Sequence, residues 1–149
     1  MSKVTVEREH WIDCIDQIMP LCIAVHNLDE KDALGLDLDF DFELYEQSEA
    51  SGQFHCLVMR ENGIPIGFHW ITMNPLARFK GKWQACTDAI YVAPEHRKHS
   101  NFLIQCSEEY IRKLGCYTWA LATLDACYRG AMWERKGFRK AETIFMKRV

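Results

Sequence analysis

DAIYVAPEHRKHSNFLIQCSEEYIRKLGC, residues 88–116, is the stretch that decides the fold. Its first residues continue a strand-like run that starts at Lys82 and stops before Pro94, because proline cannot donate a hydrogen bond to a neighbouring strand. From Asn101 to Leu114 apolar residues recur at helical spacing, and Gly115 ends the pattern. The stretch therefore predicts a strand, a short loop and a helix in succession.

Patterns on both sides add the remaining elements. Residues 8–26 carry apolar residues at helix-like spacing, with Pro20 bending or dividing the helix. Two strand-like runs flank Glu61-Asn62-Gly63, whose Asn-Gly pair supplies the positive φ that hairpins favour. Residues 34–49 alternate for a few positions and then become helix-like, so they indicate no single element. Later patterns predict a strand at Tyr117–Leu124, a helix at Asp125–Lys136 and a closing strand at Thr143–Val149.

This order of elements predicts an α/β fold (α+β mixed sheet). Helix, hairpin, strand, helix, strand, helix and strand follow one another, which fits antiparallel strands first and a β-α-β crossover later. The length of 149 residues and the lack of a linker-like tract predict one domain over residues 1–149. In such a topology a ligand site lies at the carboxyl end of the strand before the crossover helix.

Composition narrows the classes of function. A net charge of −3 and a pI near 6.1 argue against a nucleic-acid binder that relies on overall basicity. No apolar run approaches the ~18–20 residues of a membrane span, so we expect no membrane-spanning segment. Seven cysteines without a C-x-x-C pair indicate reduced thiols, which predicts a cytoplasmic location and no metal site. Cys127 is expected to be structural, because no histidine partner is recognisable beside it.

The loop before the second helix is basic. His96, Arg97, Lys98 and His99 lie beside the amides that begin a helix, and such a helix end with added cations suits a phosphate group. Neither GxxxxGK[ST] nor GxGxxG is present, so the loop is not a P-loop or a dinucleotide fingerprint. The alternative is a solvated turn with Ser100 as an ordinary N-cap, and composition alone favours it.

The same stretch resembles the coenzyme-A motif of the GNAT N-acetyltransferases: a strand, Val, x-Pro-Glu-x-Arg, a loop, a helix and Gly. WERKGF, residues 133–138, is similar to the Tyr-Glu-Lys-Leu-Gly-Phe signature of that family. The resemblance extends across most of the chain, and VHNLDE, LDLDFDFELYEQ, RENGIPIGFHW and ETIFMKRV are similar to a branch often encoded by bacteriophages. The resemblance therefore implies a phage or prophage origin and, for a phage protein, the host cytoplasm.

The resemblance also implies a fold, an activity and a binding site. It implies a central mixed sheet flanked by helices on both faces, and transfer of an acetyl group from acetyl-CoA, as co-substrate, to a primary amine by direct attack on the thioester. The acceptor would be a protein lysine, an N-terminus or a small amine, and family members are often homodimers. The backbone of Ile90, Tyr91 and Val92 would pair with pantetheine. The amides that would hold the pyrophosphate are those of Arg97, Lys98, His99, Ser100, Asn101 and Phe102.

The chain departs from the family pattern at three positions. Ser100 and Phe102 fill the two glycine positions of the loop, and Phe102 is expected to turn its ring towards the core. Trp133 replaces the tyrosine that would protonate the departing thiolate. Two alternatives to an N-acetyltransferase therefore stay open: a catalytically impaired GNAT-fold binding protein that modulates a host or virion partner, and a coenzyme-A binder that carries a different acyl group.

One acidic residue is the candidate catalytic base. Asp88 lies four residues before Val92, where some members of the family carry an acid on the same strand, and removal of a proton from the amine requires a base or a water relay. The alternative is an ordinary polar residue near the start of a strand. His55 and His69 are expected to be packed or hydrogen-bonded rather than catalytic. The acidic run from Asp37 to Glu46 hints at a cationic acceptor, although a solvated acidic face is the favoured interpretation.

Overall fold

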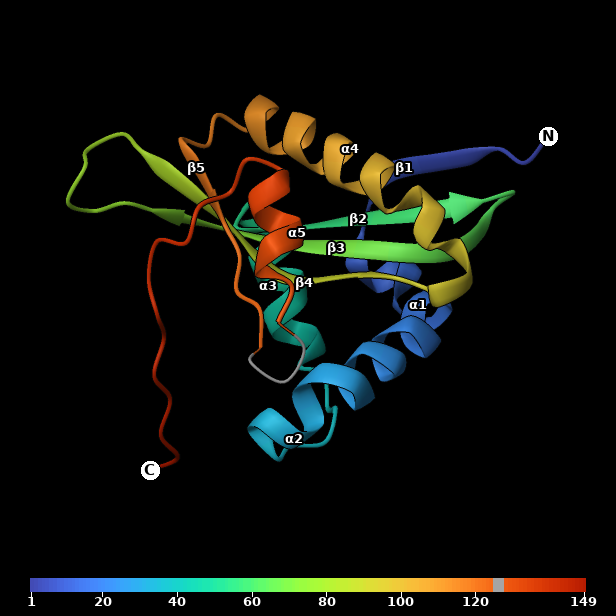
Figure 1. Cartoon of the computed structure of the whole chain (residues 1–149), viewed down its shortest axis with the longest axis horizontal. Helices are drawn as coiled ribbons and strands as arrows, with labels where there is room; N and C mark the ends of the chain where they lie inside the picture. The colour runs from blue at the N-terminus through green and yellow to red at the C-terminus, as the bar shows by residue number, and fades with distance from the viewer. Residues whose placement is uncertain (125–127) are drawn as a thin grey trace.

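The computed structural model describes residues 1–124 and 128–149 and contains one five-stranded sheet (Figure 1). The strands follow the order β1-β2-β3-β4-β5 across the sheet. Neighbours from β1 to β4 are antiparallel, and β5 runs parallel to β4, so the predicted mixed sheet is confirmed. The strands are β1 (Val4–Glu9), β2 (Phe54–Glu61), β3 (Ile64–Pro75), β4 (Trp83–Val92) and β5 (Thr118–Ala120).

Helices cover both faces of the sheet (Figure 1). One face packs against α1 (Trp11–Val25) and α3 (Phe42–Ala50), and a π-helical turn (His26–Glu30) joins α1 to α2 (Lys31–Leu34). The other face packs against α4 (Ser100–Lys113), which follows a 3-10 helix at Pro94–His99. The short helix α5 (Gly130–Arg135) lies near β5 through Trp133 and Trp119. Within the described residues no helix is long and apolar enough to cross a membrane.

The core is divided by the sheet because side chains alternate along each strand. In β2, Phe54, Cys56 and Val58 belong to the cluster beneath α1, whereas Leu57 and Met59 belong to the clusters beneath α4. Trp11 is the centre of the α1 cluster. Its ring stacks on that of Tyr45 at 4.2 Å between ring centroids, which ties α3 to the first turn of α1.

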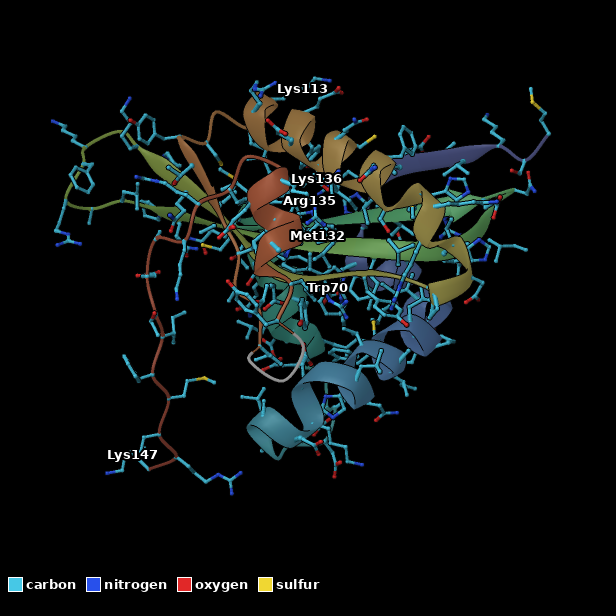
Figure 2. The ribbon with its side chains drawn as sticks, in the orientation of Figure 1. Trp70, Lys113, Met132, Arg135, Lys136 and Lys147 are labelled. Atoms are coloured by element: carbon cyan, nitrogen blue, oxygen red, sulfur yellow. The ribbon has the colours of Figure 1, made fainter. Side chains whose placement is uncertain are left out.

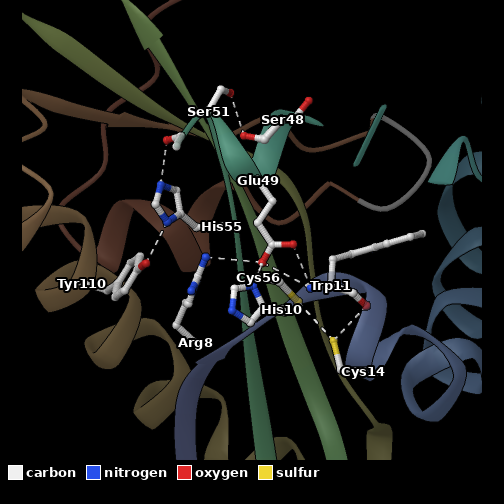
Figure 3. Close-up of polar contacts among 11 residues, drawn as sticks. Arg8, His10, Trp11, Cys14, Ser48, Glu49, Ser51, His55, Cys56 and Tyr110 are labelled. Carbon is white, nitrogen blue, oxygen red and sulfur yellow. Dashed lines mark hydrogen bonds and ion pairs between the residues drawn. The ribbon is translucent and has the colours of Figure 1, made fainter. Parts of the chain in front are cut away.

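Glu49 holds the start of α1 from a neighbouring helix (Figure 3). Its carboxylate is only 8% exposed, accepts a hydrogen bond from the Trp11 amide at 3.0 Å, and lies 3.2 Å from Nδ1 of His10 and 3.4 Å from Arg8. The first amides of a helix have no partner within the helix, so a buried carboxylate stabilises them well. This contact fixes α3 against α1, and residues of both helices line a common hollow on this face of the sheet.

Several predicted elements are corrected by the structure. Residues 4–9 form β1, which the sequence reasoning missed, because a six-residue edge strand carries too short an alternation to stand out. The strand predicted at Tyr117–Leu124 is limited to Thr118–Ala120, where β4 offers a partner. The strand predicted at Thr143–Val149 is wrong: these residues have no regular secondary structure and are exposed, because no ladder forms with them.

Two helix predictions also need correction. The helix predicted at Asp125–Lys136 is present only as α5, while its proposed start and Cys127 lie outside the described residues. The helix predicted over residues 8–26 begins at Trp11, and it continues through Pro20 without dividing. The hairpin around Asn62 is confirmed, and Asn62 has a positive φ of 51° as its turn requires.

Candidate active site

The strand β4 has an open edge over residues 87–92. β5 pairs with β4 only from Gln84 to Cys86, and beyond Cys86 the strand neighbour within the described residues is β3 alone. The predicted pantetheine residues Ile90, Tyr91 and Val92 all lie on this open edge. Unpaired backbone N–H and C=O groups along an edge can pair with an extended amide-containing ligand. The structure therefore places the three residues where such pairing is possible.

Asp88 is an extra residue in the ladder between β3 and β4. Trp70 pairs with Ala89 and Ile71 pairs with Thr87, which leaves Asp88 without a partner in the register. A bulge of this kind re-aims a side chain, and bulges are over-represented next to active sites. As a result Asp88 and Ala89, although adjacent in sequence, both line a hollow on the α1 face.

Two hollows open on this face, and Asp88 and Tyr45 line both of them. The outer hollow has a volume of about 280 Å³, and the aromatic hollow has a volume of about 230 Å³. Figure 2 shows Trp70, one wall of the aromatic hollow, on this side of the sheet. The outer hollow is lined by Leu44, Tyr45, Ser48, Gln53, Phe54, Thr72, Met73, Asn74 and Asp88. The aromatic hollow is lined by Cys22, Val25, Glu30, Leu34, Leu38, Phe40, Tyr45, Phe68, Trp70, Asp88 and Ala89.

The surroundings of Asp88 make its carboxylate a better base. Asp88 is exposed where it opens into the hollows, yet burial by the surrounding atoms raises its pKa, and the charge of Glu30 raises it further. Burial likewise raises the pKa of Tyr45, so this residue stays a neutral phenol. Within the described residues no three His, Cys, Asp or Glu side chains form a set that could hold a metal ion. The two hollows thus share one carboxylate whose pKa is raised.

A buried hydrogen-bond chain holds the point where β4 and β5 separate. Nδ1 of His69 lies 2.8 Å from the hydroxyl of Ser107 on α4, and Nε2 lies 2.8 Å from the hydroxyl of Thr87. The Thr87 hydroxyl also accepts a hydrogen bond from the indole N–H of Trp119 on β5 at 2.8 Å. His69 is 0% exposed, and burial lowers its pKa to about 3, so the imidazole is neutral. These hydrogen bonds link α4, β3, β4 and β5 next to Asp88. No motif in the sequence pointed to Thr87 or Ser107.

His55 is also a packed, hydrogen-bonded histidine, as the sequence predicted. Its Nε2 lies 2.9 Å from the Gly52 carbonyl, and its Nδ1 lies 2.7 Å from the Tyr110 hydroxyl (Figure 3). The Gly52 carbonyl can only accept, so Nε2 carries the proton and Nδ1 accepts from Tyr110. Burial lowers the pKa of His55. His55 does not line either hollow.

The predicted phosphate loop is the 3-10 helix Pro94–His99, called here the basic turn. Glu61 at the end of β2 engages its two histidines, with His96 at 2.8 Å and His99 at 3.7 Å. Arg97 and Lys98 are exposed, and the described part of the chain offers them no ion pair. The basic turn therefore leaves two cations free to meet an anion.

The first turn of α4 completes this region. Ser100 is not the N-cap: His99 takes that position, and no side chain caps the helix. The Ser100 amide already donates to the Arg97 carbonyl, so not every predicted amide is free. The ammonium of Lys136, a residue that sequence reasoning missed although it lies in WERKGF, contacts the side-chain oxygen of Asn101. The expected inward turn of the Phe102 ring is wrong, since Phe102 is 40% exposed and Leu103 fills the core in its place.

Trp133 is a packing residue of the β5 side. It is buried, and its ring meets Trp119 and Phe138 edge-on at 6.4 and 5.4 Å between ring centroids. Trp119 in turn donates to Thr87, so Trp133 supports the hydrogen-bond chain at the root of the open edge. Its only polar atom is an indole N–H, and this group cannot serve as an acid for a thiolate.

Solved structures share this fold over nearly their whole length. A ribosomal-protein-alanine N-acetyltransferase from Brucella melitensis biovar Abortus 2308 has 18% identity and a TM-score of 0.73, with 98% of this chain and 99% of that chain covered. An aminoglycoside acetyltransferase from an uncultured soil metagenomic sample has 16% identity and a TM-score of 0.76, with 99% of each chain covered. An aminoglycoside N-acetyltransferase in complex with CoA has 15% identity and a TM-score of 0.70, with 100% of this chain and 96% of that chain covered.

Sequence comparison gives the family directly. No protein of curated function matches the chain significantly. The profile of the acetyltransferase (GNAT) family matches residues 22–138, which include the aromatic hollow, the open edge, the basic turn and WERKGF. The observed five-stranded mixed sheet with helices on both faces is the fold that the resemblance implied. The chain belongs to the acetyltransferase (GNAT) family.

Proposed function

We propose that this acetyltransferase moves an acetyl group from acetyl-CoA to a primary amine, with Asp88 as the general base. The acceptor class comprises protein lysines, N-termini and small amines. The observation that carries the proposal is the bulge at Asp88. It places this residue in the lining of both hollows, directly beside the open edge of β4. An acyl donor on the edge and an amine in the hollows would meet at this residue.

The residues of the open edge and the basic turn fit acetyl-CoA. Ile90, Tyr91 and Val92 present an unpaired strand edge to the amides of pantetheine, and Arg97 and Lys98 present exposed cations to the pyrophosphate. The basic turn lies at the start of α4, where the positive end of the helix dipole favours an anion, while the Ser100 amide is already bonded to the Arg97 carbonyl. The neighbour solved with CoA has the same fold, and this supports the same placement.

On the acceptor side, Asp88 would take the proton that the amine must lose. An alkyl ammonium titrates near ~10.4, so a base close to the nitrogen contributes roughly 10²–10⁴-fold to the rate. The raised pKa of Asp88 brings its basicity closer to the working pH, where proton transfer is most effective. Direct attack of the neutral amine on the thioester then needs no covalent enzyme intermediate.

The departing thiolate would take its proton from water. Trp133 occupies the position of the usual tyrosine and lies buried among aromatic rings. A thiol titrates near ~8.5, so its thiolate is a stable leaving group near neutrality and does not require a side-chain acid.

A second candidate function is a catalytically impaired GNAT-fold binding protein that modulates a host or virion partner. The bonded Ser100 amide, the exposed Phe102 ring and the buried Trp133 favour it, because each departs from the family's catalytic pattern. The phage origin, the cytoplasmic location, the single domain over residues 1–149 and the homodimer remain predictions from the sequence.

Two measurements separate these functions. Calorimetry with acetyl-CoA tests the first step, and the absence of binding at millimolar ligand would overturn the acetyltransferase proposal. Release of free thiol in the presence of a panel of primary amines tests the second step. Binding of acetyl-CoA without thiol release from any amine would favour the impaired binding protein.

A further inference from the structure

The aromatic hollow holds two carboxylates and no basic side chain among the residues that line it. Asp88 and Glu30 share this hollow, and the charge of Glu30 contributes to the raised pKa of Asp88. Two like charges that face one partly buried space repel each other, and a cation between them would relieve the repulsion. The hollow is thus suited to a ligand that brings positive charge to both carboxylates.

A buried imidazole without a hydrogen-bond partner lies beside Glu30. His26 is buried, and neither of its ring nitrogens is hydrogen-bonded within the described residues. Its Nδ1 faces Oε2 of Glu30 at 3.5 Å, a long contact for a hydrogen bond. The Glu30 carboxylate can only accept, so a proton on Nδ1 of His26 would point toward it. His26 itself does not line the hollow, so Glu30 is the charged group that a ligand meets at this end.

The walls between the two carboxylates are apolar and aromatic. Phe40, Tyr45, Phe68 and Trp70 line the hollow together with aliphatic side chains such as Leu38. Aromatic faces attract ammonium groups, and aliphatic walls suit methylene groups. Sites for drug-sized molecules have volumes of ~300–1,000 Å³, so a hollow of about 230 Å³ fits a slender ligand better than a bulky one.

The segment of residues 29–49, which supplies part of the hollow's lining, is strongly acidic. Residues 29–49 contain nine of the 21 acidic residues of the chain and only one of its 18 basic residues. Asp37, Asp39, Asp41 and Glu43 of this segment are exposed. A surface of one sign concentrates ligands of the opposite sign, and the effect grows with the number of charges on the ligand.

We infer that the acceptor is an aliphatic diamine or polyamine, one amine of which reacts at Asp88 while a second is held by Glu30 beside His26. This inference rests on the proposed acetyl transfer to an amine and names the substrate class of the same site. In the reaction the acceptor nitrogen forms a bond to the acetyl carbon, and the bond from that carbon to sulfur breaks. One proton leaves the nitrogen through Asp88, and the thiolate gains one from water.

The test compares 1,4-diaminobutane and spermidine with n-butylamine, a monoamine of the same chain length. With acetyl-CoA and the full chain, we expect kcat/KM for the diamine to exceed that for butylamine at least ~10-fold, which corresponds to about 1.4 kcal/mol. Glu30→Gln should abolish most of this preference through KM, and Glu30→Asp should keep part of it. Glu109→Gln removes an exposed acid of α4 that lies outside residues 29–49 and lines neither hollow, and it should keep the full preference.

The outcomes separate this inference from the proposed function. Equal kcat/KM for butylamine and the diamine, or a preference that survives Glu30→Gln, would overturn the diamine inference while amine acetylation stands. A preference for a lysine peptide over every free polyamine would also overturn it. If no amine is acetylated, calorimetry of spermidine decides: binding that Glu30→Gln weakens ~10-fold supports the site, and no binding by a folded protein overturns it.

Discussion

The open edge of β4 and the aromatic hollow beside it are built in opposite ways. The open edge and the basic turn come from one contiguous stretch of chain, with exposed cations at Arg97 and Lys98. The aromatic hollow is assembled from α1, the turn after it, the acidic segment, β3 and β4, and its charges are the carboxylates of Glu30 and Asp88. An anionic co-substrate and a cationic acceptor would therefore reach β4 through surroundings of opposite charge.

The largest effect on catalysis is expected at Asp88, which lines both hollows beside the open edge. Asp88→Asn should lower kcat/KM for acetyl transfer roughly 10²–10⁴-fold, because the amine loses its base, and should leave acetyl-CoA affinity unchanged. In the wild type the rate should fall as the pH drops through the raised pKa of Asp88, since only the carboxylate accepts a proton. Thiol release against pH checks both points, with Asp16→Asn on the exposed side of α1 as the control. Equal loss in both variants would contradict the role.

A change in the backbone of the open edge should affect binding of acetyl-CoA rather than the base. A Cβ at Gly67 would lie 2.8 Å from the carbonyl oxygen of Tyr91, closer than real Cβ atoms come, and at a tight 3.2 Å from a methyl group of Val92. Gly67→Ala should therefore destabilise the protein by roughly 1–3 kcal/mol and weaken acetyl-CoA binding, because the edge must shift. Denaturant unfolding and calorimetry measure the two effects. Unchanged affinity in a destabilised variant would show that the edge does not carry the co-substrate.

The buried His69 should make stability depend on pH. Its pKa of about 3 in the folded protein lies below the usual ~6.5, so below pH ~6.5 the unfolded chain binds a proton that the folded protein does not. The free energy of unfolding should then fall by about 1.4 kcal/mol for each pH unit of acidification in this range. His55, whose pKa burial also lowers, acts in the same direction.

His69→Gln isolates that contribution. The variant should unfold more easily at neutral pH, because Thr87 and Ser107 lose a partner, but its stability should vary less with pH between about 6.5 and 5. Urea unfolding at several pH values measures the slope. An identical slope in wild type and variant would mean that His69 is charged in the folded protein.

The smallest effect is expected from a single exposed cation of the basic turn. Arg97→Ala should weaken acetyl-CoA binding by ~0.5–1 kcal/mol, or about 2–5-fold, because an exposed ion pair is partly screened by water. The loss should shrink as ionic strength rises. Arg78→Ala, an exposed arginine in the connection between β3 and β4, is the matched control. A larger loss in the control would remove the basic turn from the site.

The sequence correctly predicted those helices, strands and turns that depend on neighbouring residues in the chain. Asn62-Gly63 predicted the hairpin because its turn requires a positive φ, and Pro94 with the helical spacing after Asn101 predicted the passage from β4 to α4. The strand predicted at residues 143–149 failed because a strand depends on a partner that its own residues do not specify. The short strand β1 was missed for a related reason, since its partners in β2 lie 47 to 57 residues further along the chain, from Glu9↔Cys56 to Val4↔Glu61.

The candidate site divides along the same line. Contiguous stretches of the amino-acid sequence were enough to predict the family resemblance, the cations of the basic turn, and the shared strand of Asp88, Ile90, Tyr91 and Val92. Three features became visible only in the folded protein: the bulge at Asp88, the carboxylate of Glu30 in the same hollow and the hydrogen-bond chain through His69. Strand register, side-chain burial and the effect of a carboxylate far away in the sequence all depend on how segments pack against each other. No local sequence pattern contains that packing.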